Sequence, residues 1–152
     1  MTHKVRTCLW FNGGGLEAAQ LYVSLLPDSQ IETTVSPDAT KPPLVIDFTL
    51  AGTPYQILDA GPYHPQNECV SISVMTEDQA ETDRLWTALT ANGGADGNCG
   101  WLKDRFGVSW QIVPKALMRC LSSPDRAAAG RAMQAMMQMN KIDIAAIEAA
   151  HG

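Results

Sequence analysis

Two stretches of the chain decide the fold: VRTCLWFNGGGLEAAQLYVSLL, residues 5–26, and CVSISVMTEDQAETDRLWTAL, residues 69–89. In the first, apolar side chains alternate over residues 5–11, which is typical of a strand with one buried face. After three glycines, apolar residues recur at the spacing of one helix face: Leu16, Ala19, Val23 and Leu26. The pattern therefore predicts a strand over 5–11 and an amphipathic helix over 14–26.

The second stretch has the same order. Residues 69–75 have strong β-propensity and predict a strand. Thr76 followed by Gln79 has the pattern of a capping box, which indicates that a helix begins there. The sequence Asn92-Gly93-Gly94 supplies a left-handed stop for that helix.

The two predicted helices coincide at a single offset. Leu21-Tyr22-Val23-Ser24-Leu25 lies 64 positions before Leu85-Trp86-Thr87-Ala88-Leu89. The same offset carries Asn12, our predicted N-cap of the first helix, onto Thr76. A shared offset for cap and apolar face favours a duplicated strand–helix–strands unit.

The rest of the chain completes the two units and adds a tail. Further strands are predicted at 30–35, 44–51, 54–60, about 99–103 and 108–113, and helices at 125–139 and about 143–150. The sequence therefore predicts an α+β fold with two βαβββ modules, at about 5–60 and 68–114, and a helical tail over about 115–150. The methionines of the tail are explained either by core packing or by a subunit contact.

Composition restricts the class of protein. The chain is 45% hydrophobic, has a formal net charge of −5 and carries no Lys- or Arg-rich stripe, which argues against a nucleic-acid partner. Because no segment has the pattern of a signal peptide or a membrane span, we expect a cytoplasmic protein with no membrane partner. Four cysteines without C-x-x-C spacing predict reduced thiols.

Several motifs together resemble one known family. They are Cys8-Leu9-Trp10-Phe11, Glu17-Ala18-Ala19, Tyr22, Gly61-Pro62, Asn67-Glu68, Asp78-Gln79-Ala80-Glu81, Asp83, Trp86, the distinctive block from Cys99-Gly100-Trp101-Leu102-Lys103-Asp104 through Phe106-Gly107 and Ser109-Trp110-Gln111 to Pro114, and the tail from Met133 to Asp143. The chain is similar to the PhnB-like family, which carries the label 3-demethylubiquinone-9 3-methyltransferase domain. That family belongs to the vicinal-oxygen-chelate superfamily of glyoxalases, bleomycin-resistance proteins and extradiol dioxygenases.

The resemblance implies one vicinal-oxygen-chelate domain over residues 1–152, in which the two modules form a cupped mixed sheet around a small-molecule cavity. It also implies a homodimer, because exposed strand edges are otherwise a liability. The short Pro-rich connection at 36–43 departs from the longer loop that relatives often have.

Superfamily enzymes usually bind a divalent metal through His and Glu side chains from four strands. The resemblance places the corresponding positions at Arg6 or Cys8, at Leu58 or Asp59, at Cys69 and at Gln111. Arginine does not ligate metals, and glutamine is a weak ligand compared with a carboxylate. We therefore predict no cofactor and no standard metal centre; an atypical thiolate site of Cys8, Cys69, Asp59 and His64 is the alternative.

Ten residues are candidates for the cavity: Cys8, Trp10, Asp59, His64, Asn67, Glu68, Cys69, Ser71, Trp101 and Gln111. They combine aromatic walls with a few polar anchors, as small-molecule pockets do. In the alternative interpretation, Asn67-Glu68 caps a turn and Glu68 is solvated. Strand alternation predicts that Gln111 faces the cavity while Trp110 and Ile112 face the opposite side.

Three functions follow, and no catalytic residue is assigned. The first is a metal-independent small-molecule-binding protein of the vicinal-oxygen-chelate type. The second is a metal-dependent lyase, isomerase or dioxygenase of that superfamily. The third is the methyltransferase of the family label, for which the only signal is the turn Gly13-Gly14-Gly15, a place where a helix N-terminus could bind an anion.

Overall fold

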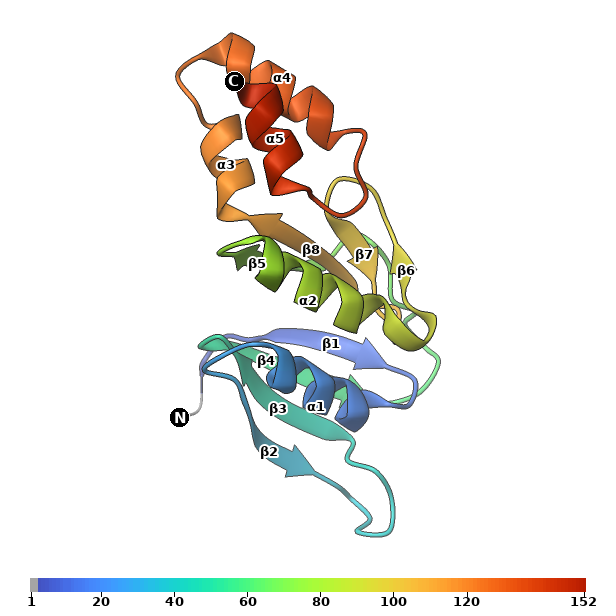
Figure 1. Ribbon diagram of the computed structural model, residues 1–152. Helices are drawn as coiled ribbons and strands as arrows, with labels where there is room; N and C mark the ends of the chain where they lie inside the picture. The colour runs from blue at the N-terminus through green and yellow to red at the C-terminus, as the bar shows by residue number, and fades with distance from the viewer. Residues whose placement is uncertain (1–2) are drawn as a thin grey trace. The chain divides into compact units, whose positions relative to one another are not determined.

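The computed structural model describes residues 3–152, which divide into two compact units between Gln66 and Asn67. Each unit contains a four-stranded mixed sheet with a helix against one face (Figure 1). The element order confirms the predicted α+β class with two βαβββ modules and a helical tail.

The first unit holds the first module. Its elements are β1 (Thr7–Phe11), α1 (Gly15–Leu25), β2 (Gln30–Val35), β3 (Val45–Leu50) and β4 (Thr53–Asp59). The strands lie in the order β1-β4-β3-β2, with β1 and β4 parallel and the other pairs antiparallel. A tight turn at Ala51 and Gly52, both with positive φ, connects β3 to β4.

The second unit repeats this topology. Its module consists of β5 (Ser71–Thr76), α2 (Gln79–Thr90), the 3-10 turn η1 (Ala91–Gly93), β6 (Ala95–Asp96), β7 (Trp101–Lys103) and β8 (Ser109–Pro114). The strand order is β5-β8-β7-β6, and β5 and β8 are again the parallel pair. The duplication predicted from the helix offset is therefore present, since α1 and α2 begin at Gly15 and Gln79.

Strand alternation gives each sheet one buried and one open face. In the first unit the buried side chains are Leu9, Phe11, Ile46, Phe48, Leu50 and Ile57 on the sheet and Ala18, Ala19 and Tyr22 on α1. In the second unit they are Ile72, Leu102, Trp110 and Ile112 on the sheet and Leu85, Trp86 and Leu89 on α2. The helices α1 and α2 pack on these faces, which leaves the opposite face of each sheet uncovered by them.

The predicted helix caps are wrong, although the helix positions are right. The N-cap of α1 is Gly14, with no side-chain cap, instead of Asn12. The N-cap of α2 is Asp78, whose carboxylate accepts a hydrogen bond from the Glu81 amide at 2.9 Å. Thr76 is the last residue of β5, and its buried hydroxyl lies 2.7 Å from that of Thr82, which leaves it unable to cap the helix.

The tail forms three helices, α3 (Lys115–Leu121), α4 (Arg126–Met136) and α5 (Ile144–His151). They share a core of Leu117, Cys120, Ala132, Ile142 and Ile147, against which Met136 and Met139 pack. Met133 and Met137 are exposed, so the methionines divide between core and surface. We predicted α4 and α5 but not α3.

Two other observations concern the whole described chain. Among residues 3–152, no helix combines the length and the apolar character that crossing a membrane requires. All four cysteines carry free thiols, and Cys8 and Cys69 are exposed.

Candidate functional site

The open face of the second sheet carries the polar side chains of its central strands. Pairing places Trp101 opposite Gln111 and Lys103 opposite Ser109, while the buried residues between them face α2. Ser71 pairs with Ser109 and lies on the same face. As expected from alternation, Gln111 lies on the face opposite Trp110 and Ile112.

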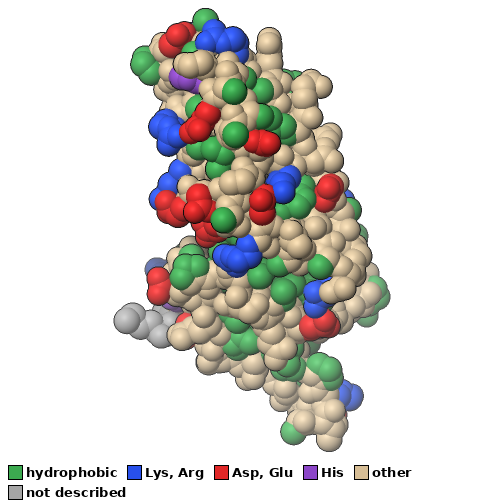
Figure 2. All heavy atoms as spheres, viewed as in Figure 1, with side chains coloured by type: hydrophobic (Ala, Val, Ile, Leu, Met, Phe, Trp, Pro, Cys, Tyr) green, Lys and Arg blue, Asp and Glu red, His purple; other side chains and the backbone are tan. Residues whose placement is uncertain are grey.

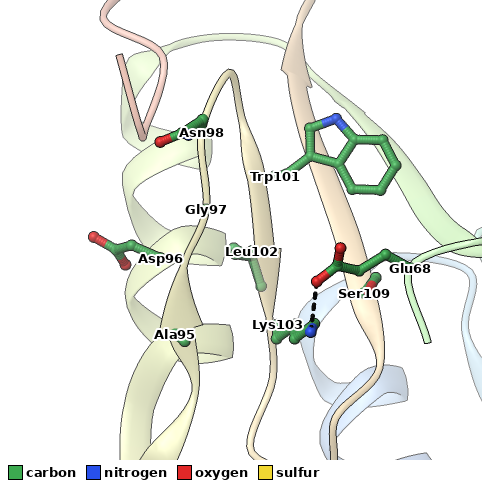
Figure 3. Close-up of a pocket in the computed structure, with 9 residues that line it drawn as sticks. All are labelled: Glu68, Ala95, Asp96, Gly97, Asn98, Trp101, Leu102, Lys103 and Ser109. Carbon is green, nitrogen blue, oxygen red and sulfur yellow. Dashed lines mark ion pairs between the residues drawn. The ribbon is translucent and has the colours of Figure 1, made fainter. Parts of the chain in front are cut away.

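A pocket of about 540 Å³ lies on this sheet, next to the turn between β6 and β7 (Figure 3). It is lined by Glu68, Ala95, Asp96, Gly97, Asn98, Trp101, Leu102, Lys103 and Ser109. All of these residues belong to the second unit. The volume lies within the range of small-molecule sites, roughly 300–1,000 Å³.

An ion pair crosses the pocket. Lys103 Nζ lies 2.5 Å from Glu68 Oε1, and the two side chains point toward one another in Figure 3. The hydrogen bond from Lys103, together with its positive charge, lowers the pKa of Glu68 below its ordinary value. Both side chains are substantially exposed, so the pair stabilises the fold little, and a ligand group can replace either partner at small cost.

Ser109 provides a polar group without a partner. Its side chain is almost completely buried, with 1% exposure, and its Oγ has no hydrogen-bond partner among residues 3–152. A buried hydroxyl left without a hydrogen bond costs about 1–3 kcal/mol. A ligand or an ordered water in the pocket would satisfy this hydroxyl.

The predicted site residues of the second unit are distributed around this pocket. Glu68 and Trp101 line it. Ser71 and Gln111 lie beside it on the open face, where Gln111 Nε2 donates to Ser71 Oγ at 2.8 Å. Asn67 forms a turn by accepting a hydrogen bond from the amide of Cys69, and both residues are exposed ahead of β5. The turn-capping interpretation therefore fits Asn67, whereas Glu68 pairs with Lys103.

Three predicted residues of the first unit, Cys8, Trp10 and His64, lie on or next to its own open face. Trp10 Nε1 donates to the Gly61 carbonyl at 2.7 Å, and the indole meets the His64 ring edge-on at 4.5 Å between centroids. Partial burial raises the pKa of the Cys8 thiol, and the nearby Asp47 adds to this, while Arg6 opposes it. The protonated thiol is therefore favoured at neutral pH, and a thiolate ligand is disfavoured.

Asp59 requires a correction, because it faces α1 and not the open face. Its two carboxylate oxygens accept hydrogen bonds from the amides of Gly13 and Gly15 at 2.5 and 2.9 Å. A Cβ on Gly15 would lie 2.7 Å from Ile57 and 3.0 Å from Asp59, so only glycine allows this approach. Asp59 thus caps the start of α1 from β4.

The register also corrects the positions expected for metal ligands. Aligning the pair Leu9–Ile57 with the pair Ile72–Trp110 matches Cys8 with Ser71 and Leu58 with Gln111. These four open-face positions therefore carry the thiol of Cys8, the hydrocarbon side chain of Leu58, the hydroxyl of Ser71 and the amide of Gln111. Among residues 3–152, no three His, Cys, Asp or Glu side chains gather where they could hold a metal. These residues do not fit the divalent metal that the superfamily implies.

Lys103 and Ser109 are pocket residues that we did not predict. Trp101 and Lys103 are two positions apart on one strand, so alternation would have placed Lys103 beside Trp101. Alternation from Gln111 would likewise have placed Ser109 on the open face, but a serine in a strand does not by itself indicate a binding residue.

These features define the class of protein. Two βαβββ modules of equal topology characterise the fold of the vicinal-oxygen-chelate superfamily. Residues 3–113 match the family described as 3-demethylubiquinone-9 3-methyltransferase, and the chain belongs to that family. The match ends before the tail, so it does not support the similarity we saw over Met133–Asp143.

Solved structures agree with this assignment. A putative 3-demethylubiquinone-9 3-methyltransferase, PhnB protein, from Bacillus cereus is 29% identical, with 74% of this chain and 99% of that chain covered and a TM-score of 0.65. Protein PA1353 from Pseudomonas aeruginosa is 25% identical, with 74% and 98% covered and a TM-score of 0.62.

A variant of the fosfomycin resistance protein FosX from Listeria monocytogenes, solved with Mn(II) and 1S,2S-dihydroxypropylphosphonic acid, shares the fold at 14% identity. The alignment covers 74% of this chain and 92% of that one, with a TM-score of 0.53. A search of curated proteins found no match.

Proposed function

We propose that this chain is a metal-independent small-molecule-binding protein of the vicinal-oxygen-chelate type. Its ligand lies in the pocket of the second unit, against Trp101 and between Lys103 and Ser109. The observation that carries the proposal is the buried Ser109 hydroxyl on the wall of a pocket of suitable size, which has no hydrogen-bond partner within the described residues 3–152. An aromatic wall combined with a few polar anchors is the usual composition of such sites.

The donor set supports binding without a metal. A metal-dependent lyase, isomerase or dioxygenase needs several anionic or imidazole ligands on the open faces. At the matching positions this chain has Cys8, Leu58, Ser71 and Gln111, and burial raises the pKa of the one thiol. The enzyme interpretation would require ligands that these strands do not provide.

The methyltransferase activity in the family's description is not favoured for this chain. The glycine turn that could have bound an anion is already occupied by the carboxylate of Asp59. Each sheet contains one parallel pair, β1/β4 or β5/β8, and neither has the extended parallel βαβ series of a nucleotide-binding sheet. A cytoplasmic location and a homodimer stay predictions from the sequence and are part of this proposal.

We predict that Trp101→Ala weakens binding of 8-anilinonaphthalene-1-sulfonate by about threefold to tenfold, the usual value of an aromatic contact. The naphthalene ring of this probe can stack on Trp101, and its sulfonate can accept from Lys103 and Ser109. Glu68→Gln should strengthen binding, because it removes the carboxylate that competes for Lys103. Fluorescence titration measures the affinity, and amide chemical shifts locate the probe.

The control is Tyr63→Ala, which removes an exposed aromatic side chain outside the pocket and should leave affinity unchanged. Equal affinity in the wild type and Trp101→Ala would contradict the proposal. Shift changes centred on the exposed Met133 and Met137, with none over residues 96–103, would contradict it as well.

A further inference from the structure

The turn between β6 and β7 forms one wall of the pocket but has little support from its own strands. Gly97 and Asn98 line the pocket from this turn. β6 has two residues, Ala95 and Asp96, which pair with Lys103 and Leu102. Two more backbone hydrogen bonds close the turn, from the Gly97 amide to the Trp101 carbonyl at 2.8 Å and from the Trp101 amide to the Asn98 carbonyl at 3.1 Å. A hairpin this short is marginal by itself.

The turn also holds an unfavourable backbone conformation. Cys99 has a φ of 57° and Gly100 a φ of 85°, so both are in the left-handed region. For a side chain such as that of Cys99 this conformation is costly, and it persists where surrounding structure holds it. A hairpin of this length therefore needs further support from outside to hold Cys99 in this conformation.

The tail supplies that support. The amide of Cys99 donates to the Met139 carbonyl at 2.7 Å, and the amide of Gly100 donates to the Asn140 carbonyl at 2.7 Å. A Cβ at Gly100 would lie 2.8 Å from the Ile112 carbonyl and 3.3 Å from Ile142. The turn thus packs closely between β8 and the segment 139–142.

That segment is in turn fixed to α2. Gln79 Nε2 donates to the Ile142 carbonyl at 3.1 Å, and Gln79 Oε1 accepts from the Ile144 amide at 2.9 Å. Lys141 pairs with Asp83 at 2.6 Å. In Figure 2 the side chains over the tail and α2 include both acidic and basic groups, in agreement with the ion pairs Lys141–Asp83 and Arg119–Glu148. Gln79, which we predicted as half of a capping box, instead anchors the tail.

We propose that residues 139–142 position the wall of the pocket, so that docking of the tail and binding of a ligand stabilise each other. This inference rests on the proposed function, because the pocket is the proposed binding site. The family match ends at residue 113, so the positioning residues lie outside it. Coupling of this kind acts equally in both directions.

The test compares Gln79→Ala with Arg119→Ala in the full chain. Gln79→Ala removes both hydrogen bonds that hold the segment, whereas Arg119→Ala removes an exposed ion pair with Glu148 elsewhere in the tail. Amide hydrogen exchange at Cys99 and Gly100 should become about tenfold faster in Gln79→Ala, which corresponds to about 1.4 kcal/mol. Affinity for 8-anilinonaphthalene-1-sulfonate should fall by a similar factor, and Arg119→Ala should change neither value.

Unchanged exchange at both amides in Gln79→Ala would overturn the inference, as would faster exchange with unaltered probe affinity. If Gln79→Ala does not fold, Lys141→Ala, which removes only the pair with Asp83, is tested in the same way. If the wild type fails to bind the probe, the proposed function fails, while the exchange rates still test whether the tail holds the turn.

Discussion

Replacing Asp104 with Ala is expected to destabilise the protein by about 3–5 kcal/mol, because it leaves several buried donors without an acceptor. Asp104 is 3% exposed and is the first residue of the β7–β8 connection. Its Oδ1 accepts from the amides of Phe106 and Val108 at 2.9 and 3.0 Å, and its Oδ2 accepts from Trp110 Nε1 at 2.9 Å. One carboxylate therefore shapes the turn and fixes the core tryptophan.

Urea denaturation of the wild type, Asp104→Ala and Asp104→Asn measures the loss of unfolding free energy in each variant. The side-chain amide introduced by Asp104→Asn has one acceptor oxygen, which can face either the two backbone amides or Trp110 Nε1, while its NH₂ faces the other donor. Asp104→Asn should therefore lower the free energy of unfolding less than Asp104→Ala does, by about 1–3 kcal/mol. A loss below about 1 kcal/mol for Asp104→Ala would show that water replaces the carboxylate and that the turn does not depend on it.

Ile142→Ala is expected to cost about 2–5 kcal/mol, the usual range for removing most of a buried aliphatic side chain. Ile142 is fully buried and belongs to the tail core with Leu117, Cys120, Ala132 and Ile147. It also packs close to Gly100. The substitution should therefore loosen the tail and the β6–β7 turn together.

The matched control is Met137→Ala, since Met137 is 62% exposed in the same tail and should change stability by less than about 0.5 kcal/mol. Stability is read from urea denaturation of the two variants. If both substitutions cost the same small amount, the tail core would contribute nothing to the folded state, and the account of the tail would be wrong.

Local patterns were enough to predict the modules. Alternation placed β1, β-propensity placed β5, and helical spacing placed α1 and α2 at one offset. The caps could not be predicted, because the group that satisfies the start of α1 is Asp59, which lies 44 residues from Gly15 in sequence and reaches it only through the β1–β4 pairing. β6 and α3 were missed because elements of two and seven residues carry too little periodicity.

The site was harder to predict than the fold, because a shift of one residue in a strand reverses the face of a side chain. The choice between Leu58 and Asp59 depended on that register, and the structure places Leu58 on the open face. Cys69 lies before β5 begins, so Ser71 occupies the metal-ligand position that we had assigned to Cys69. Glu68 and Trp101 were predicted as site residues. The pairing of Glu68 with Lys103 was not predicted, because it depends on a contact between segments that are distant in sequence.

On the proposed function, the pocket of the second unit binds a small molecule without a metal. The most direct test is calorimetric titration of EDTA-treated protein with Mn²⁺, Ni²⁺ and Zn²⁺, followed by titration with 8-anilinonaphthalene-1-sulfonate in the presence and absence of each ion. We predict no uptake at one ion per chain and the same probe affinity under all conditions. Stoichiometric binding of one metal ion, with probe binding only when that ion is present, would contradict the account.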